Sequence, residues 1–248
     1  SGLVVVHGGG TDAAVYKRLA SRLAASFTVH VYNRRGRGKS APRPADYGLQ
    51  TEVQDLKSIL AATASSRVIG HSVGGFLALA AARELPIERL ALFDPTVNVD
   101  GSFPSDYLPE FERLVAAGDT KKAMLTVSKG LRNPGSDWPE TIQRLAVSAV
   151  LLTPPGKTMV RLLPTVPAES RLAFEVDGPA SDWATVTSET RFYIGAKSPD
   201  YYVPIAEALV RAMPNASIEM VPRLGHDAVA RAGSSLVKSL SQFLGGSD

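Results

Sequence analysis

The 248-residue sequence contains no cysteine, and this absence excludes several kinds of chemistry. Without thiols the chain has no disulfide, no thiolate metal site and no cysteine nucleophile. Its four histidines, His7, His30, His71 and His226, lie far apart and lack the close spacing of a metal-binding helix. We therefore expect neither a metal nor a cofactor.

Long apolar runs and a strong excess of one charge are also missing. No apolar stretch approaches the roughly 20 residues that a transmembrane helix needs, and no secretory signal is visible. Basic and acidic residues number 27 and 24, and the densest basic run, Arg34 to Lys39, is interleaved with glycine and holds no aromatic residue. We interpret this run as a loop, and we expect a cytoplasmic protein with no nucleic-acid or membrane partner.

What remains is the composition of a folded protein, with 44% hydrophobic and 21% charged residues. Short apolar runs alternate with segments of helical periodicity through the first 96 residues. This alternation predicts right-handed βαβ units, a mostly parallel sheet and the α/β fold class. The predicted strands are 3–6, 27–32, 67–70 and 90–93, and the predicted helices are 12–25, one ending near residue 64, and 74–84.

Residues 97–185 interrupt the alternation. They contain helical patterns around 108–117, 120–131 and 139–152, separated by proline-rich loops, and no convincing strand. The alternation resumes with predicted strands at 191–194 and 217–221 and predicted helices at 203–213 and 228–244. We therefore expect a core domain of residues 1–96 and 186–248, with a six-stranded sheet flanked by helices, and a helical insertion over that sheet.

The stretch GHSVG at residues 70–74 raises the question of whether Ser72 is a turn residue or a nucleophile. It matches the G-x-S-x-G elbow, in which a sharp strand-to-helix turn exposes a serine hydroxyl. Gly70 and Gly74 supply the physical reason, because larger side chains two residues either side of the serine would collide in so tight a turn. A predicted strand before the motif and a predicted helix after it favour the nucleophile.

Acyl chemistry at a serine also needs backbone donors for the oxyanion, and HGGG at residues 7–10 suits that purpose. The expected donors are the N–H groups of Gly9 and Val73, and His7 is expected to order the loop. A phosphate-binding loop is the alternative, but the full Walker and dinucleotide patterns are missing.

The base should be a histidine that reaches the serine from a later loop. His226, in VPRLGHDAV, lies between the last predicted strand and the last predicted helix, so we expect it to be the base. His71 adjoins Ser72 and should point away from it, and His30 lies inside a predicted strand.

Together HGGG, NRRGRGKS, GHSVGG and the terminal GH resemble the α/β-hydrolase superfamily over nearly the whole chain apart from the insertion. The resemblance implies that residues 97–185 form a helical cap, which shapes the substrate pocket. It also implies a triad of serine, histidine and acid. The chain departs from the family in beginning directly at the strand before the oxyanion loop, so that six strands are expected in place of eight.

The acid is the second departure. Many members carry it in a G-x-x-D loop, but the matching stretch here is Gly195-Ala196-Lys197-Ser198. Asp200 lies two residues later, whereas Asp94 ends the strand after the elbow helix, where a minority branch that includes some lipases and zearalenone-type lactonases places its acid. An Asp before Pro is also a common turn former. Because Ser198 occupies the usual acid position, we choose Asp94, and the expected triad is Ser72, His226 and Asp94.

These residues predict a serine hydrolase that cleaves a carboxylic ester or lactone of a small, largely hydrophobic molecule through an acyl-enzyme. A lyase, cyclase or thioesterase using the same triad is one alternative, since the fold does not determine the substrate. A ligand-binding protein with a vestigial triad is another. The insertion supplies apolar side chains for a pocket, and most of them are expected to pack the cap: Tyr107, Leu108, Phe111, Trp138, Leu151, Leu152, Met159, Leu162 and Leu163.

Overall fold

A computed structural model describes residues 1–246 and contains one six-stranded sheet in the order β2-β1-β3-β4-β5-β6. All five strand pairings are parallel, as the alternation of strands and helices predicts. The strands are β1 (Gly2–Val6), β2 (Thr28–Val31), β3 (Ser65–His71), β4 (Arg89–Phe93), β5 (Glu189–Gly195) and β6 (Ala216–Val221).

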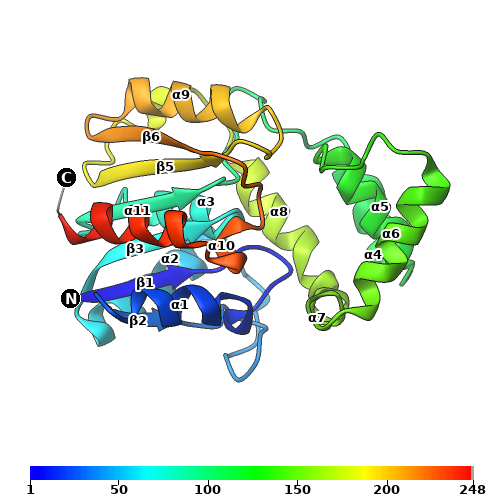
Figure 1. The fold of residues 1–248 in the computed structure, drawn as a ribbon, viewed down its shortest axis with the longest axis horizontal. Coiled ribbons are helices and arrows are strands. Elements are labelled where there is room, and N and C mark those ends of the chain that lie inside the picture. Colours follow the sequence, from blue (N-terminus) through cyan, green and yellow to red (C-terminus); the bar gives the residue numbers. More distant parts are fainter. Residues whose placement is uncertain (247–248) are drawn as a thin grey trace.

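Helices cover both faces of this sheet (Figure 1). On one face Val4 and Val6 of β1 belong to the same apolar cluster as α2 (Leu49–Thr63), α3 (Val73–Ala81) and α9 (Tyr202–Ala212). On the other face Leu3 and Val5 pack with α1 (Lys17–Leu23) and α11 (Ser234–Gly245). Successive residues of a strand point to opposite faces, so a strand covered on both sides is apolar at every position.

Five helices lie between β4 and β5, and we call them the cap helices: α4 (Leu108–Ala116), α5 (Thr120–Gly130), α6 (Glu140–Leu152), α7 (Pro154–Leu162) and α8 (Val166–Glu175). Figure 1 shows α4 to α7 set apart from the sheet, with α8 running back toward it. The sequence predicted α4, α5 and α6 but indicated no further helix within 153–185. Prolines in the first turns of α7 and α8 account for the omission, because proline is tolerated there and breaks a helix only further along.

Two other predicted helices have different bounds in the structure. The helix predicted at 228–244 is divided into α10 (Ala228–Arg231) and α11, because Ala232 adopts a left-handed φ of 47° before Gly233. The helix predicted at 12–25 begins as a 3-10 turn (Ala13–Tyr16) and continues as α1. The expected core range ends at residue 248, and its last two residues lie outside the described part.

The topology brings the candidate site residues to one edge of the sheet. Ser72 follows β3, Asp94 follows β4, and His226 follows β6, so all three lie at the carboxyl ends of parallel strands. The HGGG loop follows β1, from which the chain goes to β2 on one side and later returns to β3 on the other. Such a switch point opens a crevice, and ligands of open α/β sheets bind there. Within residues 1–246, no helix combines the length and the apolarity needed to cross a bilayer.

Candidate active site

Ser72 lies on a strained turn between β3 and α3. Its φ of 55° and ψ of −127° place an ordinary side chain in a sparsely populated region. A Cβ at Gly74 would lie 2.3 Å from the Val6 carbonyl oxygen, and one at Gly70 would lie 2.7 Å from the Gly75 Cα. The turn therefore requires glycine at both positions for the steric reason that the sequence indicated.

Asp94 is fully buried at the end of β4 and also adopts a positive φ, 41°. Its Oδ1 accepts a hydrogen bond from the Gly195 N–H at 3.1 Å. Its Oδ2 accepts one from the Ser198 hydroxyl at 2.5 Å and lies 3.2 Å from His226 Nδ1. The residue in the customary acid position thus donates a hydrogen bond to the carboxylate that stands beside the histidine.

Asp200, the other candidate acid, lies elsewhere. Its side chain is 85% exposed, and its Oδ1 lies 3.4 Å from an Arg132 guanidinium nitrogen. Asp94 is therefore the one of the two candidate aspartates that the structure brings to His226.

His226 is held from several sides. Its ring stacks on Tyr202 with centroids 5.7 Å apart and lies 4.7 Å from the ring of His71. His71 Nε2 donates to the His226 backbone carbonyl at 2.8 Å. The side chain of His226 is 34% exposed, so the ring is held by its neighbours and is still accessible from solvent.

A hydrogen-bonded chain connects His226 to the HGGG loop. The Gly8 N–H donates to the Tyr16 hydroxyl at 2.9 Å, and that hydroxyl donates to His71 Nδ1 at 2.6 Å. Burial and the neighbouring His226 lower the pKa of His71 to about 3, so His71 is neutral, with one ring nitrogen donating and the other accepting. No sequence signal marked Tyr16, because its partner lies 55 residues away.

The HGGG loop runs beside the elbow. Gly9 and Val73 both line the cavity described below, and among the residues described neither N–H donates to another group of the chain. His7 is fully buried; its Nδ1 donates to the Gly8 carbonyl at 2.9 Å, and its Nε2 accepts from the Arg34 N–H at 3.1 Å. Burial, with Arg34 nearby, holds the pKa of His7 well below its usual value, so the ring is neutral.

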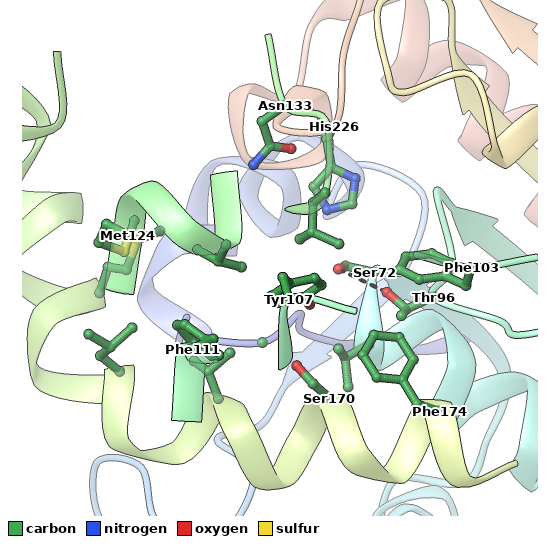
Figure 2. A pocket seen from close by; sticks show the side chains of 18 of the residues that line it. Ser72, Thr96, Phe103, Tyr107, Phe111, Met124, Asn133, Ser170, Phe174 and His226 are labelled. Atoms are coloured by element: carbon green, nitrogen blue, oxygen red, sulfur yellow. Dashed lines mark hydrogen bonds between the residues drawn. The ribbon is translucent and has the colours of Figure 1, made fainter. Parts of the chain in front are cut away.

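A cavity of about 210 Å³ lies between the elbow and the cap helices (Figure 2). Ser72 and His226 face it from the core, while Tyr107, Phe111 and Met124 face it from the cap. Of the apolar cap residues that the sequence suggested, Met159 and Leu163 also line the cavity, whereas Trp138 and Leu152 are exposed.

Thr96 was not expected at the site. Its Oγ1 lies 3.4 Å from Ser72 Oγ, its N–H donates to the Ser72 carbonyl at 3.1 Å, and it lines the same cavity. Its position two residues after the candidate acid, at a strand end, was the available signal.

Two arginines of the basic run after β2 are buried and take part in an ion cluster with the cap. Arg34 and Arg37 are buried and, together with Arg43, donate to Oε1 of Glu169 in α8. Arg34 also donates to Glu52 at 2.9 Å. We call these five residues the Glu169 cluster. A Cβ on Gly9 would lie 3.2 Å from Glu169 Oε2, so the cluster lies directly behind the HGGG loop.

Comparison with known proteins places the chain in a family. The model of the alpha/beta hydrolase family matches residues 3–234. An alpha/beta hydrolase from Sphaerobacter thermophilus, of known crystal structure, is similar with 30% identity and a TM-score of 0.79, over 97% of this chain and 91% of that one.

Two curated proteins are more distant relatives. The chain is 27% identical over 139 residues to 2-heptyl-3-hydroxy-4-quinolone dioxygenase AqdC2 of Rhodococcus erythropolis, covering 55% of this chain and 52% of the relative. It is 29% identical over 143 residues to the pimeloyl-(acyl-carrier protein) methyl ester esterase of Xanthomonas oryzae, covering 57% and 42%. The chain thus spans about half the length of these curated relatives. With a matched family model, a common fold and an elbow serine at the expected strand end, the chain belongs to the alpha/beta hydrolase family.

Proposed function

We propose that this protein is a serine hydrolase that cleaves a small carboxylic ester or lactone through an acyl-enzyme. The observation that carries the proposal is the convergence of three groups from separate strand ends. Ser72 faces the cavity from a strained turn, His226 lines the same cavity, and His226 Nδ1 lies 3.2 Å from the buried Asp94 carboxylate.

In the proposed reaction Ser72 Oγ attacks the substrate carbonyl carbon while His226 Nε2 takes the hydroxyl proton. The step requires Oγ to turn from Thr96 toward His226, a rotation about a single bond. Asp94 accepts the Nδ1–H, which keeps the attacking tautomer and stabilises the imidazolium that forms. His226 then protonates the leaving oxygen, and a water molecule activated by His226 hydrolyses the acyl-enzyme.

The N–H groups of Gly9 and Val73 are the proposed oxyanion donors. Both line the cavity and are free of other partners among the described residues, so they are available where negative charge develops on the carbonyl oxygen. Removing one such donor costs other acyl-transfer enzymes roughly 10² to 10³ in rate. We propose residues 97–185 as the cap that closes the other side of this cavity.

The cavity supports a small and uncharged substrate. Its volume, about 210 Å³, lies below the range of about 300–1,000 Å³ that is usual for drug-sized ligands. None of the described residues that line it is Asp, Glu, Lys or Arg. One curated relative is named an esterase and another a dioxygenase, so family membership alone leaves the reaction open and product analysis must identify it.

A labelling experiment tests the nucleophile. A fluorophosphonate probe should modify the protein once, and peptide mass spectrometry should locate the adduct on Ser72, because phosphonylation needs a serine activated by a working base. Ser72→Ala should abolish both labelling and the hydrolysis of a series of esters and lactones of graded size. Hydrolysis that persists in Ser72→Ala would refute the proposal.

A further inference from the structure

Asn133 has hydrogen-bonding groups that the protein does not use. Several other polar side chains of the cavity already have partners: the Tyr201 hydroxyl donates to the Leu131 carbonyl at 3.1 Å, and the hydroxyls of Ser72 and Thr96 lie 3.4 Å apart. The Asn133 amide lines the cavity, yet within residues 1–246 neither its oxygen nor its NH₂ group has a hydrogen-bond partner. Its donors and acceptor are available to a ligand.

The chain around Asn133 is fixed. The Asn133 N–H donates to the Ser128 carbonyl at 2.9 Å, and Tyr201 of the core holds the Leu131 carbonyl. Between these two cavity-lining residues Arg132 adopts a positive φ of 50° and turns its side chain outward, with 64% exposed. A non-glycine residue in this conformation costs about 1 kcal/mol or more and persists where the surroundings enforce it. The turn directs Leu131 and Asn133 to the cavity and Arg132 away from it.

Asn133 lies at the same end of the cavity as His226. Figure 2 shows the two side chains above Ser72, both on the cavity wall, while Phe111 and Met124 lie farther along it. In the hydrolysis proposed above, which this inference extends, His226 must reach the leaving oxygen to protonate it. The leaving group therefore lies on the Asn133 side.

We propose that Asn133 is a specificity-determining residue that hydrogen-bonds to the leaving-group portion of the substrate. The preferred substrates are uncharged esters or lactones that carry a neutral hydrogen-bonding group, such as a hydroxyl, carbonyl or amide, within a few atoms of the leaving oxygen. An amide side chain suits such a group because it both donates and accepts. The cavity provides no described ionised side chain that would pair with a charged group.

The test compares two esters of matched size, 2-hydroxyethyl butanoate and propyl butanoate, in which a hydroxyl replaces a methyl group. We expect Asn133→Leu to lower the ratio of kcat/KM for the hydroxyethyl ester to that for the propyl ester about tenfold, the value of one hydrogen bond. Asn215→Leu is the matched control, since Asn215 lies before β6 at the opposite end of the sheet and its side chain donates to the Thr187 carbonyl.

A binding measurement tests the role of Asn133 independently of hydrolysis. In the Ser72→Ala background, ligand-observed NMR titrations should show that Asn133→Leu raises the ratio of the Kd for the hydroxyethyl ester to that for the propyl ester about tenfold. If the wild-type protein hydrolyses neither ester but this binding ratio changes, the hydrolase proposal fails and the inference stands. A ratio that Asn133→Leu leaves unchanged, a change reproduced by Asn215→Leu, or no binding of either ester would overturn the inference.

Discussion

Within residues 1–246 two carboxylates are completely buried, Asp94 in the core and Glu169 in the cap, and their surroundings are opposite in kind. Each accepts hydrogen bonds from three residues. Those of Asp94 are a backbone N–H, a hydroxyl and an imidazole, none of which carries a fixed charge. Those of Glu169 are three guanidinium groups, which donate only and stay charged at every relevant pH.

This difference separates a carboxylate suited to chemistry from one suited to holding parts together. The Ser198 hydroxyl and the His226 ring can each exchange donor and acceptor roles, so the Asp94 surroundings adjust to a change of charge on the histidine. The Glu169 cluster cannot adjust in this way. It sets three arginines against two carboxylates. Four of its buried atoms have no partner among the described residues: Glu169 Oε2, Glu52 Oε2, Arg34 Nε and Arg43 Nε. Its members act as a fixed link between α8 and the loop after β2.

The largest expected effect comes from Asp94→Asn. The amide keeps the shape of the carboxylate, but its NH₂ group faces His226 Nδ1 and favours the wrong imidazole tautomer. We expect kcat/KM for the best ester to fall about 10³- to 10⁴-fold with little change in Tm, because Ser198 and His226 can both turn from donor to acceptor.

Asp200→Asn is the matched control for that measurement. Its side chain is 85% exposed and forms a surface pair of the kind that contributes little, so we expect kcat/KM to change less than about threefold. If Asp94→Asn kept its activity while Asp200→Asn lost it, the acid would be Asp200. Asp94 would then not be the buried carboxylate that takes part in the reaction.

The second effect is expected in stability. Glu169→Gln makes the same carboxylate-to-amide change among partners that cannot reverse their roles. It leaves the buried Arg34 and Arg37 and the partly exposed Arg43 with Glu52 as the remaining carboxylate of the cluster. Breaking a buried ion pair costs about 3–5 kcal/mol, which in a chain of this size lowers Tm by about 10 °C. Thermal unfolding followed by circular dichroism measures the shift.

Exposed glutamates provide the control for Glu169→Gln. Glu110, on α4, pairs with Arg113 at the surface, and Glu110→Gln should change Tm by about 1 °C or less. Equal shifts for Glu110→Gln and Glu169→Gln would show that the buried cluster is not the stabilising link that its geometry indicates. A loss of kcat/KM in Glu169→Gln as large as in Asp94→Asn would remove the division of roles between the two carboxylates.

The sequence predicted the elbow and the sheet because both follow from near neighbours. Gly70 and Gly74 are two residues from Ser72, and the collisions that exclude larger side chains there are local. Strands and helices alternate in short units, and such alternation predicts a parallel sheet with right-handed crossovers. The structure places Asp94 beside His226, and the choice of Asp94 from the sequence rested on the absence of an acid at position 198.

The Glu169 cluster and the Tyr16–His71 link could not be predicted in the same way. Arg34 and Glu169 are 135 residues apart, and they meet only after α8 docks on the core. Because α7 and α8 have prolines in their first turns, neither helix was predicted from the sequence. The helix that carries Glu169, α8, was therefore missing from the predicted fold. A glutamate in an unassigned loop gave no reason to expect that buried arginines would surround it.

The smallest expected effect concerns Ser198, which donates to the oxygen of Asp94 that also faces His226. Ser198→Ala removes that donor, so the carboxylate interacts more strongly with the His226 imidazolium. Because that imidazolium forms as Ser72 attacks, we expect kcat/KM to rise about threefold, the factor that corresponds to one hydrogen bond of about 0.7 kcal/mol.

Ser239→Ala is the matched control, because the Ser239 hydroxyl likewise donates to a carboxylate, that of Glu219, at 2.7 Å. Ser239 lies in α11, outside the cavity, so its removal should leave kcat/KM unchanged. A fall of kcat/KM in Ser198→Ala would mean that the hydroxyl strengthens the contact between Asp94 and His226. The uncharged groups around Asp94 would then strengthen the effect of its negative charge on His226 instead of weakening it. The three arginines would be the remaining difference between the surroundings of Glu169 and those of Asp94.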